Sequence, residues 1–192
     1  FLPLSTASAV PAQTAGGVIM ASLFLIRHGQ ASVGSANYDQ LSPLGQRQAD
    51  VSGRFFAEIG LHFGQAASGD LSRQQETGQR VLARQPEPAD LRTDPRLNEV
   101  DNEGQIAALL PILCERDADF AERVKAGRSD SKQYQKVIQA VFNAWVSPDC
   151  PTLDGTASWP DYLVGVRGAL AEAMEQAESG SDTAIFTSGG TI

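Results

Sequence analysis

Short apolar runs alternate along this chain with longer amphipathic segments, and this alternation constrains the fold more than any other feature. The first run, residues 22–27 (SLFLIR), is followed by a polar stretch and predicts a buried strand. Further short strands are expected at residues 63–68, 89–93 and 183–187. Strands separated by helices pair in parallel and need helices on both faces. The chain therefore predicts a three-layer α/β fold with a mostly parallel sheet.

The segments between these strands carry helical signals. Residues 71–84 predict a helix with Asp70 as a candidate cap, and residues 103–180 predict a mainly helical cap region. Within that region, residues 134–145 and 159–177 repeat apolar side chains at helical spacing. The first helix is expected to begin with Ser42 as N-cap and Pro43 in its first turn, and to end at Gly60. Four apolar residues would share one face of this first helix: Leu44, Val51, Phe55 and Ile59.

Length and composition limit the architecture and the partners. With 192 residues, the chain is long enough for one domain with a core that needs no metal or disulfide framework. Its net charge of −8 argues against nucleic acid and anionic membranes as partners. A cytoplasmic location is a separate expectation. Residues 1–19 carry no charge and are interpreted as a non-core extension before Met20, with residues 20–192 forming the domain. Because a further helix normally follows such a last strand, a truncation after Ile192 is also expected.

The candidate chemistry lies at the carboxyl end of the first strand, where α/β sheets bind ligands. Arg27, His28 and Gly29 follow one another there. An imidazole can attack phosphorus while a guanidinium binds phosphoryl oxygens, and glycine allows close backbone approach. The chain has only two histidines, and the other, His62, precedes the second strand at the opposite end of the sheet. Taken alone, an arginine and a histidine at a strand end are also compatible with an ordinary surface pair.

Five segments come in an order that resembles the histidine phosphatase superfamily, the phosphoglycerate-mutase-like proteins. They cover residues 22–103 and 183–192 and read LIRHGQAS, LSPLGQRQA, SGDLSRQQET, LNEV and TAIFTSGGTI. The resemblance implies that His28 is a nucleophile that forms a phosphohistidine and that Arg27 and Arg73 bind the phosphoryl oxygens. It implies that Glu99 is the proton donor and acceptor. No cofactor and no metal are implied, because the arginines supply the positive charge.

Two positions depart from the family pattern. The asparagine that the family carries after the first motif has no clean match, and Asn37 is the nearest candidate. Ser188 stands where the family has a second histidine. One hypothesis is a phosphatase in which Ser188 and the backbone of Gly189 and Gly190 bind the phosphate instead. The alternatives are a catalytically impaired pseudophosphatase that binds phosphorylated ligands or a partner and, less favoured, a phosphoglycerate mutase. The sequence leaves the oligomeric state and the substrate open.

Overall fold

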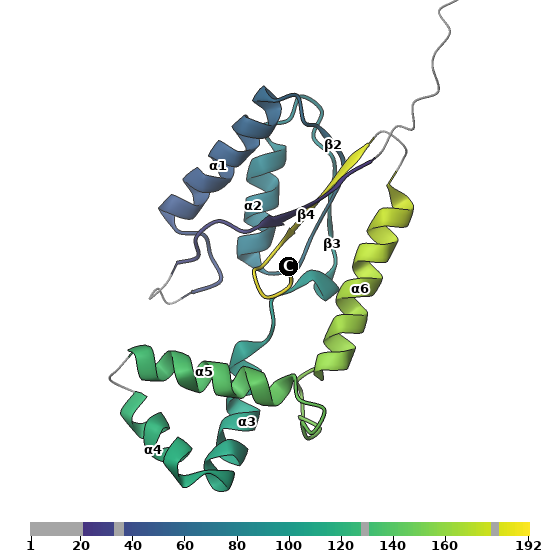
Figure 1. Cartoon of the computed structure of the whole chain (residues 1–192). Coiled ribbons are helices and arrows are strands. Elements are labelled where there is room, and N and C mark those ends of the chain that lie inside the picture. The colour runs from purple at the N-terminus through teal and green to yellow at the C-terminus, as the bar shows by residue number, and fades with distance from the viewer. Residues whose placement is uncertain (1–20, 33–36, 128–130, 178–180) are drawn as a thin grey trace, which may run out of the picture.

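A four-stranded parallel sheet forms the centre of the molecule (Figure 1). The computed structural model describes residues 21–32, 37–127, 131–177 and 181–192. The strands lie in the order β1-β4-β2-β3, so β4, the last strand in the chain, pairs with both β1 and β2. Their bounds are β1 (Leu23–Arg27), β2 (Phe63–Ser68), β3 (Leu91–Thr93) and β4 (Asp182–Thr187). All four lie within or close to the predicted runs.

Helices cover both faces of the sheet, which confirms the three-layer α/β prediction. Helices α1 (Pro43–Glu58) and α2 (Ser72–Leu82) pack on one face, where Val81 and Leu82 contact Ala184 and Phe186 of β4. Helix α6 (Trp159–Gln176) covers the other face, where Ala169 and Ala173 pack against Ile185. Neighbouring residues of β4 thus contribute to two separate cores, as the alternation of side chains along a strand requires.

The remaining helices lie apart from the sheet in Figure 1. A short 3-10 helix, η1 (Pro95–Leu97), leads from β3 towards α3 (Asn102–Arg116), α4 (Ala118–Gly127) and α5 (Ser131–Trp145). Trp145 of α5 is almost fully buried, and its ring contacts those of Trp159 and Tyr162 at the start of α6. The region of residues 103–180 is therefore mainly helical, as predicted, but α6 belongs to the sheet layer.

The prediction for the buried face of α1 was incomplete. The predicted cap is present, because Ser42 Oγ accepts a hydrogen bond from Gly45 N and Pro43 follows. However, the four apolar residues at helical spacing are exposed, by 44% to 57%. The residues that α1 buries are small: Gly45, Ala49 and Gly53. A Cβ atom on Gly53 would lie 2.8 Å from Val81 O, so close packing against α2 selects small residues and leaves the larger side chains outside.

Asp70 does not cap α2, which corrects a second prediction. The N-cap position belongs to Leu71, whose side chain makes no cap hydrogen bond. The Asp70 carboxylate instead accepts a hydrogen bond from Asn98 Nδ2 at 2.6 Å. The predicted extension at residues 1–19 lies outside the described residues. In the part of the chain that the structure describes, none of the helices combines the length and apolar character needed to span a bilayer.

Candidate active site

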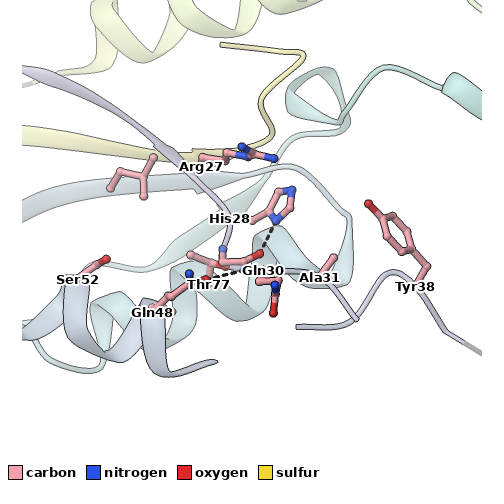
Figure 2. Close-up of a pocket in the computed structure, with 11 residues that line it drawn as sticks. Arg27, His28, Gln30, Ala31, Tyr38, Gln48, Ser52 and Thr77 are labelled. Atoms are coloured by element: carbon pink, nitrogen blue, oxygen red, sulfur yellow. Dashed lines mark hydrogen bonds between the residues drawn. The ribbon is translucent and has the colours of Figure 1, made fainter. Parts of the chain in front are cut away.

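His28 is fixed in one orientation where β1 ends. Its backbone N–H donates to Thr187 O at 2.9 Å, which joins the residue after β1 to the end of β4. In the side chain, Nδ1 lies 2.6 Å from Gly29 O (Figure 2). Since a carbonyl oxygen only accepts, Nδ1 must carry the proton in this contact. The second nitrogen, Nε2, then holds the lone pair of the neutral imidazole, which is the form that can attack phosphorus.

Arg73 reaches this nitrogen from the first turn of α2. Its Nε–H donates to His28 Nε2 at 3.3 Å, and its side chain is almost fully buried. Thr77, one turn further along α2, accepts from Gly29 N at 3.1 Å and donates to Arg73 O at 2.7 Å. The structure thus brings together the two groups that the sequence predicted as nucleophile and clamp, and Thr77 connects their backbones.

The surroundings of His28 lower its pKa below the usual 6.5. Burial of the ring is the largest cause, and the positive charges of Arg73 and Arg27 act in the same direction. The hydrogen bond to Gly29 O and the charge of Glu99 act in the opposite direction and are outweighed. A lowered pKa keeps the imidazole neutral at neutral pH, as a nucleophile requires.

Arg27 and His28 line one cavity of about 570 Å³ at the edge of the sheet, together with Tyr38 and Thr77 (Figure 2). Arg27 is exposed at the end of β1. A Cβ atom on Gly189 would lie 3.5 Å from Arg27 Nε, so the turn after β4 runs along the arginine side chain. Arg27 can therefore offer its charge to an anion beside His28.

Glu99 is held by the turn that follows β4. Its Oε1 accepts from Gly190 N at 3.0 Å and from Val100 N at 3.1 Å. The carboxyl group is only partly buried, and its charge acts on His28. The structure therefore places the predicted acid and base close enough to the predicted nucleophile to influence it. It also shows that Gly190 N–H, predicted as a phosphate donor, already binds Glu99.

Ser188 does not present its hydroxyl to the cavity. The residue is completely buried, and its Oγ accepts from Gln74 Nε2 at 2.8 Å, inside the protein. This geometry argues against the predicted direct contact between Ser188 and a phosphate. Gln74 is itself completely buried and also donates to Leu97 O. The Ser188 hydroxyl is thus bound by an internal amide.

Two further predicted positions have clear surroundings. Asn37 is exposed, and its Oδ1 accepts from Asp39 N at 3.1 Å, so the side chain stabilises its own loop. His62 lies just before β2, with Nδ1 3.3 Å from Gln85 Oε1, and belongs to the end of the sheet opposite His28. Sequence reasoning missed Asp39, which forms a 2.7 Å ion pair with Arg73. The one rule that could have pointed to Asp39 is general: a buried arginine needs an anionic partner.

Among the residues that the structure describes, no group of three or more His, Cys, Asp or Glu side chains is arranged to hold a metal ion.

Comparison with known proteins identifies the part of the chain that carries this site. Residues 23–105 match the family model of the histidine phosphatase superfamily, branch 1. The match covers 83 of the 192 residues. The matched segment contains the four predicted catalytic residues, Arg27, His28, Arg73 and Glu99, whereas Ser188 and Gly189 lie outside it. No curated protein sequence matches the chain.

Several solved structures share the fold at low sequence identity. A mycobacterial glucosyl-3-phosphoglycerate phosphatase solved with VO3 is 21% identical, with a TM-score of 0.56 over 88% of this chain and 76% of that chain. A phosphoglycerate mutase from Bacillus anthracis is 17% identical, with a TM-score of 0.57 over 89% of this chain and 76% of that chain. A protein described as mycobacterial hydrolase 2 is 20% identical, with a TM-score of 0.57 over 88% and 67% of the two chains. The chain therefore shares the fold of a phosphatase and of a phosphoglycerate mutase.

Proposed function

We propose that this protein is a phosphomonoester hydrolase that forms a phosphohistidine on His28. The observation that supports the proposal most directly is the contact between His28 Nε2 and Arg73 Nε at 3.3 Å. In this contact His28 Nε2 is unprotonated, because the proton of the imidazole is on Nδ1, which donates to Gly29 O. The Arg73 guanidinium can bind the oxygens of the phosphoryl group that Nε2 attacks. The hydrogen bond between these two nitrogens opens when a phosphoryl group comes to lie between them, and Arg73 Nε–H is then released to bind a phosphoryl oxygen.

The reaction would proceed in two displacements. In the first, the lone pair of His28 Nε2 attacks phosphorus, the bond to the alcohol oxygen breaks, and a protonated Glu99 gives its proton to that oxygen. In the second, the Glu99 carboxylate takes a proton from water, the water oxygen attacks phosphorus, and the N–P bond breaks to release inorganic phosphate. Arg27 and Arg73 stabilise the phosphoryl oxygens in both steps. No metal is required in this scheme.

The replacement of the second histidine should slow the reaction without abolishing it. Because Ser188 is buried against Gln74, charge stabilisation falls to Arg27 and Arg73, with the exposed Gly189 backbone beside Arg27 as a further donor. Loss of one transition-state donor commonly costs on the order of 10²- to 10³-fold in rate. We therefore infer a slow phosphatase for a small phosphorylated substrate.

The buried Ser188 also supports one alternative, a pseudophosphatase that binds phosphorylated ligands without turning them over. Hydrolysis of p-nitrophenyl phosphate in the presence of EDTA distinguishes the two. The phosphatase proposal predicts turnover by the wild type and none by His28→Ala. Equal rates for the two proteins would refute it, and phosphate binding without turnover would favour the pseudophosphatase.

A further inference from the structure

The guanidinium of Arg73 is held at two of its nitrogens by different partners. Its Nε–H points to His28 Nε2, while NH1 donates to Asp39 Oδ1 at 2.7 Å. The Arg73 side chain is 8% exposed and that of Asp39 is 32% exposed. Arg73 therefore uses Nε towards His28 and NH1 towards Asp39. The ion pair at NH1 can persist while Nε changes its hydrogen-bond partner.

Asp39 is itself anchored to α2. Its second oxygen, Oδ2, accepts from the backbone N–H of Ser72 at 2.7 Å, in the first turn of the helix. Leu71, the N-cap residue, provides no side-chain hydrogen bond there, so Asp39 satisfies a helix donor from outside the helix. The partial positive charge of a helix N-terminus also stabilises a carboxylate. One carboxylate thus links the helix N-terminus to the Arg73 guanidinium.

The residue before Asp39 also contacts the guanidinium. Arg73 Cζ lies over the Tyr38 ring, 5.5 Å from its centroid, within the range of a cation–π contact. A guanidinium that contacts a ring and is bound at NH1 has less freedom to rotate. Its Nε–H therefore stays directed at His28, where the phosphoryl group would form.

We propose that Asp39 is a positioning residue, which holds Arg73 by NH1 so that the rest of the guanidinium faces the phosphoryl group. This inference rests on the proposed phosphatase function. Asp39 does not touch the reacting atoms in this scheme and acts through Arg73. Its carboxylate would stay on NH1 and Ser72 N during turnover, while Arg73 Nε–H moves its hydrogen bond from His28 to a phosphoryl oxygen.

The role of Asp39 can be tested by whether removal of its charge strengthens or weakens phosphate binding. A negative charge near an anion site repels phosphate, so its removal should tighten phosphate binding if charge alone mattered. Loss of positioning acts in the opposite direction, because a displaced guanidinium binds the anion less well. Asp39→Asn is nearly isosteric, and its amide oxygen can still accept from Ser72 N. The variant therefore removes the charged contact with Arg73 while it preserves the anchor on α2.

The matched control is Asp50→Asn. Asp50 also pairs with arginines, Arg80 at 3.3 Å and Arg84 at 3.1 Å, on the surface between α1 and α2. The substitution makes the same change in net charge without contact to Arg73. We would titrate each protein with inorganic phosphate by calorimetry and measure kcat and KM with p-nitrophenyl phosphate. Thermal melting would verify that each variant is folded.

Asp39→Asn is expected to lower kcat by about 10- to 100-fold, since misplacement of a catalytic contact by about 1 Å has effects of this size. Phosphate affinity should fall roughly tenfold, which corresponds to a loss of about 1.4 kcal/mol in binding free energy. Asp50→Asn should match the wild type within about twofold, as expected for a screened surface pair. Phosphate binding by Asp39→Asn as tight as that of Asp50→Asn, or tighter, would overturn the inference.

A double-mutant cycle with Arg73→Ala tests the route of the effect. If Asp39 acts through Arg73, Asp39→Asn no longer weakens phosphate binding once the guanidinium is gone. An equal weakening in both backgrounds would overturn the inference. The titrations remain decisive if the wild type binds phosphate but shows no turnover, in which case only the proposed hydrolysis fails. A wild type that binds no phosphate would overturn both.

Discussion

Gly29→Ala should cost both stability and activity, because the backbone at Gly29 lies in direct contact with α1. A Cβ atom added there would lie 2.4 Å from Gly45 O, 2.9 Å from Gly45 C and 3.0 Å from Gly45 Cα. Real Cβ atoms essentially never come within 3.0 Å of such atoms, so the contact with Gly45 O must open by about 0.6 Å. The obstacle is helix backbone, which cannot rotate aside as a side chain would. Overpacking of this kind typically costs about 1–3 kcal/mol of unfolding free energy.

The displacement acts on the nucleophile as well. Gly29 supplies the carbonyl that fixes His28 Nδ1 and the N–H that binds Thr77. A shift of about 0.6 Å in these groups should lower kcat by about 10-fold, and by no more than about 10²-fold, which is the effect of a 1 Å misplacement. Urea unfolding gives the stability change, and p-nitrophenyl phosphate hydrolysis gives kcat.

Gly165→Ala is the matched control for Gly29→Ala. Gly165 lies inside α6, and a Cβ atom there meets its nearest neighbour, Arg96 Cγ, at an ordinary 3.7 Å. The same substitution should therefore stabilise the protein by about 0.5–1 kcal/mol, through helix propensity. A Gly29→Ala protein as stable and active as the wild type would refute the packing argument.

Two further predictions concern the titration and the charge of the site. Because His28 must be neutral to attack and its pKa lies below 6.5, kcat/KM should fall as the pH drops through a midpoint below 6.5; a pH–rate profile with its acid midpoint at or above 6.5 would contradict this. Ser188→Ala should leave kcat within about twofold of the wild type, because the hydroxyl is bound to Gln74 inside the protein and the charge of the site comes from Arg27 and Arg73. A fall in kcat of tenfold or more, measured with the same substrate, would show that the Ser188 hydroxyl does contact the phosphate.

The strands, the layers and the central pair of the site could be predicted from the sequence. Short apolar runs identify strands, and a parallel sheet brings their carboxyl ends to one edge, which is why Arg27 and His28 could be located. The resemblance to a family then identified Arg73 and Glu99. The strands and layers are confirmed, and His28 and Arg73 do lie together, while the catalytic roles of these residues stay predictions.

Three features could not be predicted because they depend on close contacts between distant segments. The exposed apolar stripe of α1 was misjudged because the backbone contact at Gly53 rewards small residues, which a periodic pattern of large ones does not reveal. The burial of Ser188 depends on Gln74, more than a hundred positions away in the chain. The ion pair between Asp39 and Arg73 joins a loop to α2, and the two residues meet only in the folded protein.

The central claim is that His28 carries a phosphoryl group during turnover. Phosphohistidine is labile in acid and stable in base, so rapid quenching in base during hydrolysis of a ³²P-labelled phosphomonoester preserves it for peptide mapping. We expect acid-labile label on the peptide that contains His28, and none on His28→Ala. Steady turnover by the wild type without label on that peptide, or label that persists in His28→Ala, would contradict the account.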